Sequence, residues 1–152
     1  MGTAAAATIR EAVRSDVPPV LALWRIDDVA ASRTDDEEAL EALEGHPTST
    51  LLVAEADGTI VGSVIVGWDG WRGELYRLVV APSHRRNRVA TELVRAGERR
   101  LLDQGARRIS VLVLEEADAA AAFWRSVGYE QHDGMSRFVR VADGSGTAHA
   151  KT

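Results

Sequence analysis

The sequence predicts one α/β domain, in which a mixed β-sheet carries helices on both faces. The chain has 152 residues, 45% hydrophobic and 27% charged, as expected of a globular domain of ordinary size. Residues 50–67 contain two β-branched runs around Asp57-Gly58, a tight-turn pair that predicts an antiparallel hairpin. Two further apolar runs, 75–80 and 109–114, flank one helical pattern. This arrangement predicts a right-handed crossover between neighbouring parallel strands.

The N-terminal half begins with a short strand at 7–13, followed by a helix that Asp16 is expected to cap. Two prolines stand in the first turn of this helix, where a missing N–H group removes no hydrogen bond. Its apolar side is formed by Val20, Leu21, Leu23 and Trp24. A second helix is predicted at 34–45, because acidic residues crowd its positively polarised start and Gly45 ends it.

The C-terminal half continues the alternation of strands and helices. The predicted elements are a glycine-punctuated loop at 67–71, strands at 73–82, 107–116 and 136–142, and helices at 88–105 and 118–128. Gly105 and Gly128 stand where these two helices end. We expect the small and polar stretch 143–152 and residues 1–7 to be flexible ends around one domain, 8–142.

Charge and composition restrict the function classes. The formal net charge of −5 argues against nucleic-acid binding, which usually depends on many phosphate contacts. The chain has no cysteine, so an acyl-cysteine intermediate is excluded, and its four histidines show no metal-ligand spacing. We therefore predict no metal. No apolar run approaches the roughly 20 residues that cross a bilayer and no signal peptide is recognised, so we expect a cytoplasmic protein.

A short basic turn stands out in this acidic chain. Four basic side chains lie within five positions between a predicted strand and a predicted helix: His84, Arg85, Arg86 and Arg88. A helix start exposes unpaired N–H groups and a positive dipole end, and arginine side chains suit phosphate. The turn is therefore a candidate site for a small anion, and the alternative is an ordinary solvated helix start. It is not a Walker loop, because the glycines and the lysine of that motif are absent.

Residues 78–94, LVVAPSHRRNRVATELV, together with FWRSVGY at 123–129, resemble the GNAT superfamily of acetyl-CoA-dependent N-acetyltransferases. Residues 9–24 are similar to the family's opening strand and helix, and 61–80 to its central hairpin, so the resemblance covers nearly the whole chain. The glycine-rich stretch looks most like the small bacterial YpeA-type branch. The resemblance implies a GNAT-like acyl-CoA N-acyltransferase fold, with parallel strands that splay apart, and acetyl-CoA as cosubstrate.

The family signature is Gln/Arg-x-x-Gly-x-Gly/Ala. Its six positions are occupied here by Arg85, Arg86, Asn87, Arg88, Val89 and Ala90. Arg88 stands where the family usually has glycine, so its side chain would either narrow the site or reach a CoA phosphate. By resemblance, the main-chain amides from Arg86 to Thr91 would hold the pyrophosphate. The strand edge that would bind the pantetheine arm and the thioester carbonyl is formed by Leu78, Val79 and Val80.

Acetyl transfer to an amine needs a base for the amine and an acid for the departing thiolate. In the histone-modifying branch of the superfamily a glutamate at the strand position of Glu74 is the base, which makes Glu74 the candidate here; the alternative is a solvent-facing strand-end carboxylate. Glu115 and Glu116 are weaker candidates. Trp124 stands where many members have a tyrosine that acts as the general acid. An indole cannot take this role near neutral pH, so we expect Trp124 to pack against the pantetheine. Tyr76, on the same strand face as Glu74, is then the candidate acid.

The loop at 67–71 offers a candidate acceptor site. Trp68 and Trp71 would form the floor of a pocket in which Asp69 attracts an amine, and the alternative is a hairpin stapled by its two rings. The first functional hypothesis is an N-acetyltransferase that modifies a primary amine of a small molecule or peptide by direct attack. The second is a non-catalytic CoA-binding or regulatory domain of the same fold. Nucleic-acid docking at the basic turn is disfavoured, and by resemblance a homodimer is possible.

Overall fold

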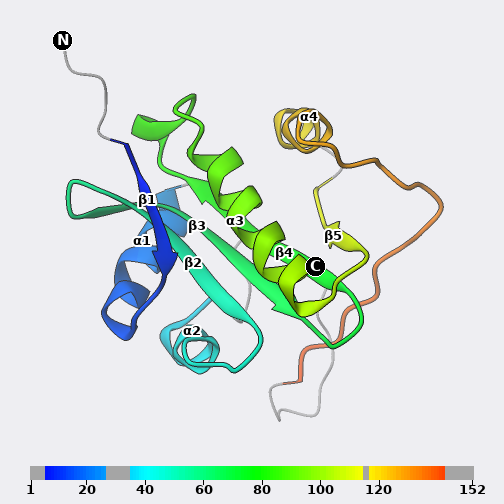
Figure 1. Ribbon diagram of the computed structural model, residues 1–152, viewed down its shortest axis with the longest axis horizontal. Helices are drawn as coiled ribbons and strands as arrows, with labels where there is room; N and C mark the ends of the chain where they lie inside the picture. Colours follow the sequence, from blue (N-terminus) through cyan, green and yellow to red (C-terminus); the bar gives the residue numbers. More distant parts are fainter. Residues whose placement is uncertain (1–5, 27–34, 115–116, 143–152) are drawn as a thin grey trace. The chain divides into compact units, whose positions relative to one another are not determined.

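The computed structural model describes residues 6–26, 35–114 and 117–142, and it divides into two compact units, 1–112 and 113–152. In the first unit the helices and strands are β1 (Thr8–Glu11), the 3-10 turn η1 (Arg14–Asp16), α1 (Val17–Ile26), α2 (Glu37–Leu43), β2 (Thr50–Ala56), β3 (Thr59–Trp68), β4 (Gly73–Val80), the 3-10 turn η2 (Pro82–His84), α3 (Val89–Gln104) and β5 (Ile109–Val111) (Figure 1). The second unit contains α4 (Asp118–Ser126).

The sheet of the first unit is mixed, as the sequence predicts. Its strands lie in the order β1-β2-β3-β4-β5; the first four are antiparallel to their neighbours, and β5 runs parallel to β4. The hairpin between β2 and β3 turns at Asp57 and Gly58, whose φ angles of 52° and 73° both lie in the left-handed region that a two-residue hairpin turn requires. The predicted hairpin and the predicted parallel crossover are therefore confirmed.

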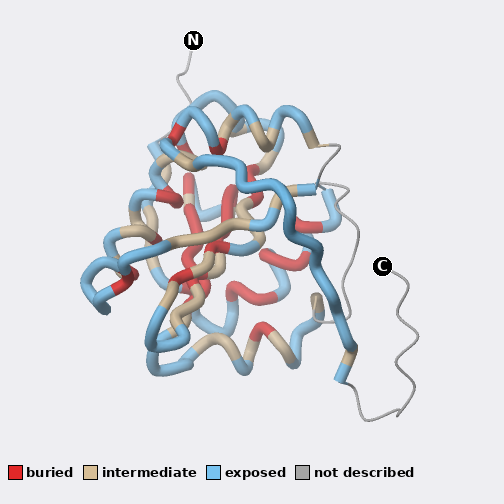
Figure 2. Tube along the Cα trace, turned by 90° about the vertical axis from the view of Figure 1, so that its right-hand side faces the viewer, coloured by how far each residue is buried: buried red, intermediate tan, exposed pale blue. Residues whose placement is uncertain are grey.

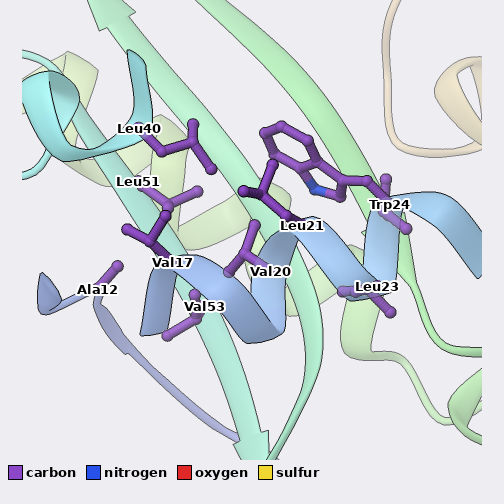
Figure 3. Packing of buried hydrophobic residues seen from close by; sticks show 10 residues of the cluster. Ala12, Val17, Val20, Leu21, Leu23, Trp24, Leu40, Leu51 and Val53 are labelled. Atoms are coloured by element: carbon purple, nitrogen blue, oxygen red, sulfur yellow. The ribbon is translucent and has the colours of Figure 1, made fainter. Parts of the chain in front are cut away.

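One face of this sheet is covered by α1 and α2. Val17, Val20 and Leu21 of α1 pack into one buried cluster with Leu51 and Val53 of β2 (Figure 3). Successive strand residues point to opposite faces, so the one residue between Leu51 and Val53 points to the other face of the sheet. The predicted apolar side of α1 is the side that forms this cluster.

The opposite face carries α3, which approaches the strands closely. A Cβ atom added at Gly62 of β3 would lie 3.0 Å from Leu93 of α3, and one added at Gly97 of α3 would lie 3.0 Å from Leu75 of β4. Leu93 and Leu101 of α3 are fully buried. Helices on both faces of a mixed sheet are thus confirmed, and buried positions concentrate along the central strands (Figure 2).

The sequence predicts that Asp16 caps α1, and this prediction is wrong. The Asp16 carboxylate instead closes the turn that precedes the helix. It accepts hydrogen bonds from the Val13 amide at 2.8 Å and from two nitrogens of Arg10 at 2.7 and 3.0 Å. The hydrogen bonds from Arg10 lower the pKa of Asp16 and raise that of the guanidinium. The Asp16 carboxylate oxygens accept from Arg10 and from the Val13 amide because hydrogen bonds with a charged donor are strong, and they therefore do not accept from the amides of α1.

The last strand predicted from the sequence, 136–142, is not formed. A strand requires a hydrogen-bonded neighbour, and the described residues of the second unit contain no other strand that could pair with it. Residues 129–142 are exposed along most of their length (Figure 2). The strand predicted at 107–116 is also shorter, since β5 ends at Val111, and Glu115 and Glu116 lie outside the described residues.

Candidate acetyl-CoA and acceptor site

The two parallel strands of the sheet pair over only three residues. Their register runs from Gly73 opposite Ile109 to Leu75 opposite Val111, where β5 ends. On its other side β4 stays paired with β3 as far as Val80. In the described sheet, residues 77–80 therefore have no strand neighbour on the edge that β5 leaves, and an extended ligand rich in amide groups fits such an edge. This is the parting of parallel strands that the sequence resemblance implies.

One carbonyl on this edge already accepts a hydrogen bond from the turn that follows. The Ala81 amide donates to Val61 of β3 at 2.8 Å. Within one trans peptide unit the C=O and N–H groups point in opposite directions, so the Val80 carbonyl points away from β3. Arg85 Nε donates to this carbonyl at 3.2 Å. The first residue of the signature thus contacts the strand edge as well as standing at the anion turn.

The turn itself has an unusual backbone. Arg86 and Arg88 have φ angles of 74° and 64°, in the left-handed region that favours glycine, and Arg88 is the N-cap of α3. The first helical hydrogen bond is donated by Glu92 to the Arg88 carbonyl at 2.9 Å. The amides of 88–91 therefore precede the first hydrogen bond of the helix and point out of its N-terminus, an arrangement that suits a diphosphate.

The backbone at Arg88 shows what the departure from the signature costs. Glycine is usual at this position, and the chain keeps the glycine-like φ although it carries an arginine. Arg88 therefore adopts a left-handed conformation that glycine adopts without a steric penalty. Because arginine has a Cβ atom, this conformation costs it on the order of 1 kcal/mol relative to glycine.

Glu74 and Tyr76 lie on one face of β4, opposite to the face that α3 covers. Glu74 pairs with Gly67 and Tyr76 with Ile65 across the β3–β4 ladder, and the intervening Leu75 packs on α3. A Cβ atom at Gly67 would lie 3.1 Å from Tyr76 Cε2, so this glycine leaves room for the tyrosine ring. The structure thus brings the two predicted catalytic side chains to the same face.

The loop after β3 is braced by its own residues. Asp69 Oδ1 accepts from the amides of Arg72 at 2.7 Å and Trp71 at 2.8 Å, and these hydrogen bonds lower the pKa of Asp69. The Arg72 guanidinium lies 3.8 Å from the centre of the Trp71 ring. Asp69 and the Trp71 ring therefore have partners within the loop itself, and the acceptor pocket stays a prediction.

Trp68 lies on a different face from the predicted base. It pairs with Gly73, whose absent Cβ would point at Leu101 of α3, so Trp68 stands on the α3 face. Glu74, the next residue along β4, stands on the other face. The structure brings Trp71 and Asp69 together in the loop but separates Trp68 from Glu74.

Trp124 belongs to α4 in the second unit. It is 9% exposed, and its ring makes edge contacts with Phe123 and Tyr129 at centroid distances of 5.4 and 5.0 Å. Its carbonyl also accepts a hydrogen bond from the Tyr129 amide at 3.0 Å, beside Gly128 with a φ of 103°. The FWRSVGY motif therefore forms a compact helix end around an indole. The predicted contact of Trp124 with pantetheine stays a prediction.

Sequence reasoning missed three residues that hold the open strand. Arg77 of β4 has a φ of 52°, and its carbonyl accepts a hydrogen bond from Ser63 Oγ, which in turn accepts one from Trp24 Nε1. The available signal in the sequence is the isolated Ser63 in the apolar run of β3.

The described residues offer neither a metal site nor a membrane-spanning helix. Within 6–26, 35–114 and 117–142, no three His, Asp or Glu side chains are grouped so that they could hold a metal ion. None of the helices described in these ranges combines the length and the apolar character needed to cross a membrane.

The fold and the signature turn define a class of protein. The sequence profile of the acetyltransferase (GNAT) family matches residues 17–129, which extend through both units, and the chain belongs to this family. It is an acyltransferase of the GNAT N-acetyltransferase type.

Individual relatives agree with this assignment. An acetyltransferase from Yersinia pestis is 35% identical over 125 residues, which cover 82% of this chain and 89% of that protein. An aminoglycoside N-acetyltransferase, AAC(6')-Iy in complex with CoA, superposes with a TM-score of 0.76 at 18% identity, over 93% of this chain and 99% of the other. The 6'-N-acetyltransferase AAC(6')-IG from Acinetobacter haemolyticus gives 0.74 at 21% identity, over 90% and 99%. These two structural likenesses concern the fold.

Proposed function

We propose that the protein transfers the acetyl group of acetyl-CoA to a primary amine of a small molecule or peptide by direct attack. The observation that carries this proposal is the edge of β4 at 77–80, which lies beyond the pairing with β5 and leads into the signature turn. Arg86 and the amides of 88–91 would bind the diphosphate, and the main chain of Leu78, Val79 and Val80 the pantetheine arm. Complexes of the fold with CoA support this donor.

In the proposed reaction Glu74 takes a proton from the ammonium group of the acceptor, directly or through a water molecule. The amine nitrogen attacks the thioester carbonyl carbon, the C–S bond breaks, and its electron pair leaves on sulfur. Tyr76 supplies the proton that this thiolate takes up, and the attacking nitrogen gives up its second proton as the amide forms, which restores the Tyr76 hydroxyl. The developing oxyanion would be stabilised by an N–H group of the β4 edge.

The acceptor is proposed to be a small cationic amine. The chain carries a net charge of −5, and the exposed carboxylate of Asp69 has a lowered pKa because it accepts hydrogen bonds from the Arg72 and Trp71 amides. The similar structures whose names state an acceptor include aminoglycoside acetyltransferases, which supports a small-molecule amine. Cytoplasmic localisation, the YpeA-type branch and a homodimer stay predictions.

Binding of the donor is tested by thermal unfolding with acetyl-CoA. Ligand at 100 times its Kd should add about 2.7 kcal/mol of stability, which corresponds to a rise in Tm of roughly 5–10 °C for a chain of this size. Arg86→Gln should reduce this shift, whereas Arg99→Gln, an exposed arginine on α3, should leave it unchanged. No shift with millimolar acetyl-CoA would contradict the proposal.

Catalysis is tested by release of free CoA in the presence of an amine library. Glu74→Gln should lower kcat by about 10²–10⁴-fold near neutral pH, as expected for a lost general base. Glu38→Gln, on the exposed side of α2, is the matched control and should have wild-type turnover. Full turnover of Glu74→Gln between about pH 6 and 9 would dismiss Glu74 as the base.

A further inference from the structure

The open strand β4 contains a bulge at Arg77. Across the β3–β4 ladder Ser63 pairs with Val79 and Ile65 with Tyr76, so Arg77 and Leu78 together face one residue of β3. Arg77 has a φ of 52°, a left-handed conformation that persists in a non-glycine residue only where the surroundings hold it. Something in the fold must therefore stabilise this backbone.

A buried chain of hydrogen bonds holds the main chain of the bulge. Trp24 Nε1 donates to Ser63 Oγ at 2.8 Å, and Ser63 Oγ donates to the Arg77 carbonyl at 3.0 Å. An indole N–H can only donate and a carbonyl can only accept, so the direction of both bonds is determined. Ser63 is fully buried and Trp24 is 5% exposed, so neither bond has a competing water shell (Figure 3 shows Trp24 in the cluster).

The side chain of Arg77 is held by the same surroundings. Its Nη2 atom lies 2.6 Å from Asp35 Oδ2, in an ion pair whose two side chains are 20% and 14% exposed. Its guanidinium carbon lies 5.3 Å from the centre of the Trp24 ring. Trp24 therefore contacts the bulge both through Ser63 and through the guanidinium.

The position of the bulge connects it to the site. Leu75 is the last residue of β4 that pairs with β5, and the bulge follows two residues later, at the start of the unpaired edge 77–80. A bulge bends its strand and increases the local twist. We propose that Trp24, Ser63 and Arg77 are positioning residues that set the course of this edge for the pantetheine arm of acetyl-CoA. This inference rests on the proposed function, and none of the three side chains needs to contact substrate.

The test separates the two halves of the ligand. Ser63→Ala removes both hydrogen bonds with little change in volume, and binding is measured by calorimetry for CoA and for adenosine 3',5'-bisphosphate, which has no pantetheine arm. We expect the Kd for CoA to rise about tenfold, equivalent to about 1.4 kcal/mol, while the Kd for the bisphosphate stays within twofold. In turnover, the KM for acetyl-CoA should rise and the KM for the amine should not.

Two further variants keep the test informative. Thr50→Val is the matched control, because the buried Thr50 hydroxyl of β2 contacts Glu11 and not β4, so both affinities should be unchanged. Trp24→Phe keeps the Ser63–Arg77 bond and the aromatic ring, and it should give a smaller loss for CoA alone. Equal losses for CoA and bisphosphate, or no loss in Ser63→Ala, would overturn the positioning role. Wild-type protein that binds neither ligand would instead refute the proposed function.

Discussion

The contact between Gly73 and Leu101 provides a sharp test of how the start of β4 is packed. A Cβ atom at Gly73 would lie 2.6 Å from Leu101 Cδ1, 2.8 Å from Cδ2 and 3.1 Å from Cγ, well inside van der Waals contact. Leu101 is fully buried in α3, so its side chain has little free space into which to move. Gly73 directly precedes Glu74 and pairs with Ile109 of β5. The close packing of Gly73 on Leu101 therefore lies next to the candidate base.

We expect Gly73→Ala to destabilise the protein by about 1–3 kcal/mol, the usual cost of extra volume in a packed core. For a chain of this size the corresponding fall in Tm is roughly 2–12 °C. Urea unfolding followed by tryptophan fluorescence measures the free energy of unfolding directly. The slope with urea should stay unchanged, because the surface exposed on unfolding is nearly the same.

A double-mutant cycle with Leu101→Ala shows whether the overlap is the cause. Leu101→Ala alone should cost about 2–5 kcal/mol, since it leaves a cavity. In that background the new methyl group at position 73 enters vacated space, so Gly73→Ala should be neutral or stabilising. If Gly73→Ala costs the same with and without the Leu101 side chain, the overlap with Leu101 is not the source, and the reasoning from this contact is refuted.

Three other predictions concern the contribution of single residues to the stability of the fold. Arg10 lowers the pKa of Asp16, so this carboxylate stabilises the fold fully above its unfolded pKa of about 3.9, and the stabilisation is lost as the pH falls through the lower folded pKa. Asp16→Asn should lower the free energy of unfolding by about 1–2 kcal/mol at pH 7. Urea unfolding at several pH values should also show a weaker loss of stability at acidic pH in this variant, and an unchanged loss would contradict the role of Asp16. At Arg88, glycine should be more stable than alanine by about 1 kcal/mol in urea unfolding, and equal stabilities would show that the backbone is not strained. Asp36 caps α2 by accepting from the amide three residues on, at 2.8 Å, so Asp36→Ala should cost about 1 kcal/mol, measured by the same method.

The basic turn illustrates how far local sequence signals reach. A basic cluster between an apolar strand and an amphipathic helix predicted the start of α3, and the structure begins this helix at Val89. The signal sufficed because hydrogen bonding at a helix start depends on the nearest four residues. The side-chain contact of Arg85 with the Val80 carbonyl was not predicted, because it depends on how the turn folds back on the strand.

The candidate catalytic face was predicted in part. The alternation of a strand placed Glu74 and Tyr76 together, and the ladder with Gly67 and Ile65 agrees. The same rule could not place Trp68 relative to Glu74, because the two residues belong to different strands. Their faces follow from the pairing of Trp68 with Gly73, which only the folded hairpin defines.

The sequence by itself determined the elements whose signals are local: the turn at Asp57-Gly58, the length of α3 and its end at Gly105, and the motif that marks the family. Hydrophobic period, turn residues and helix ends act over a few positions, so they can be seen without knowing the fold. Only the tertiary structure decided that β5 stops at Val111 and that β4 bulges at Arg77. These features depend on pairing between distant segments and on buried polar partners such as Ser63, which a linear pattern does not encode.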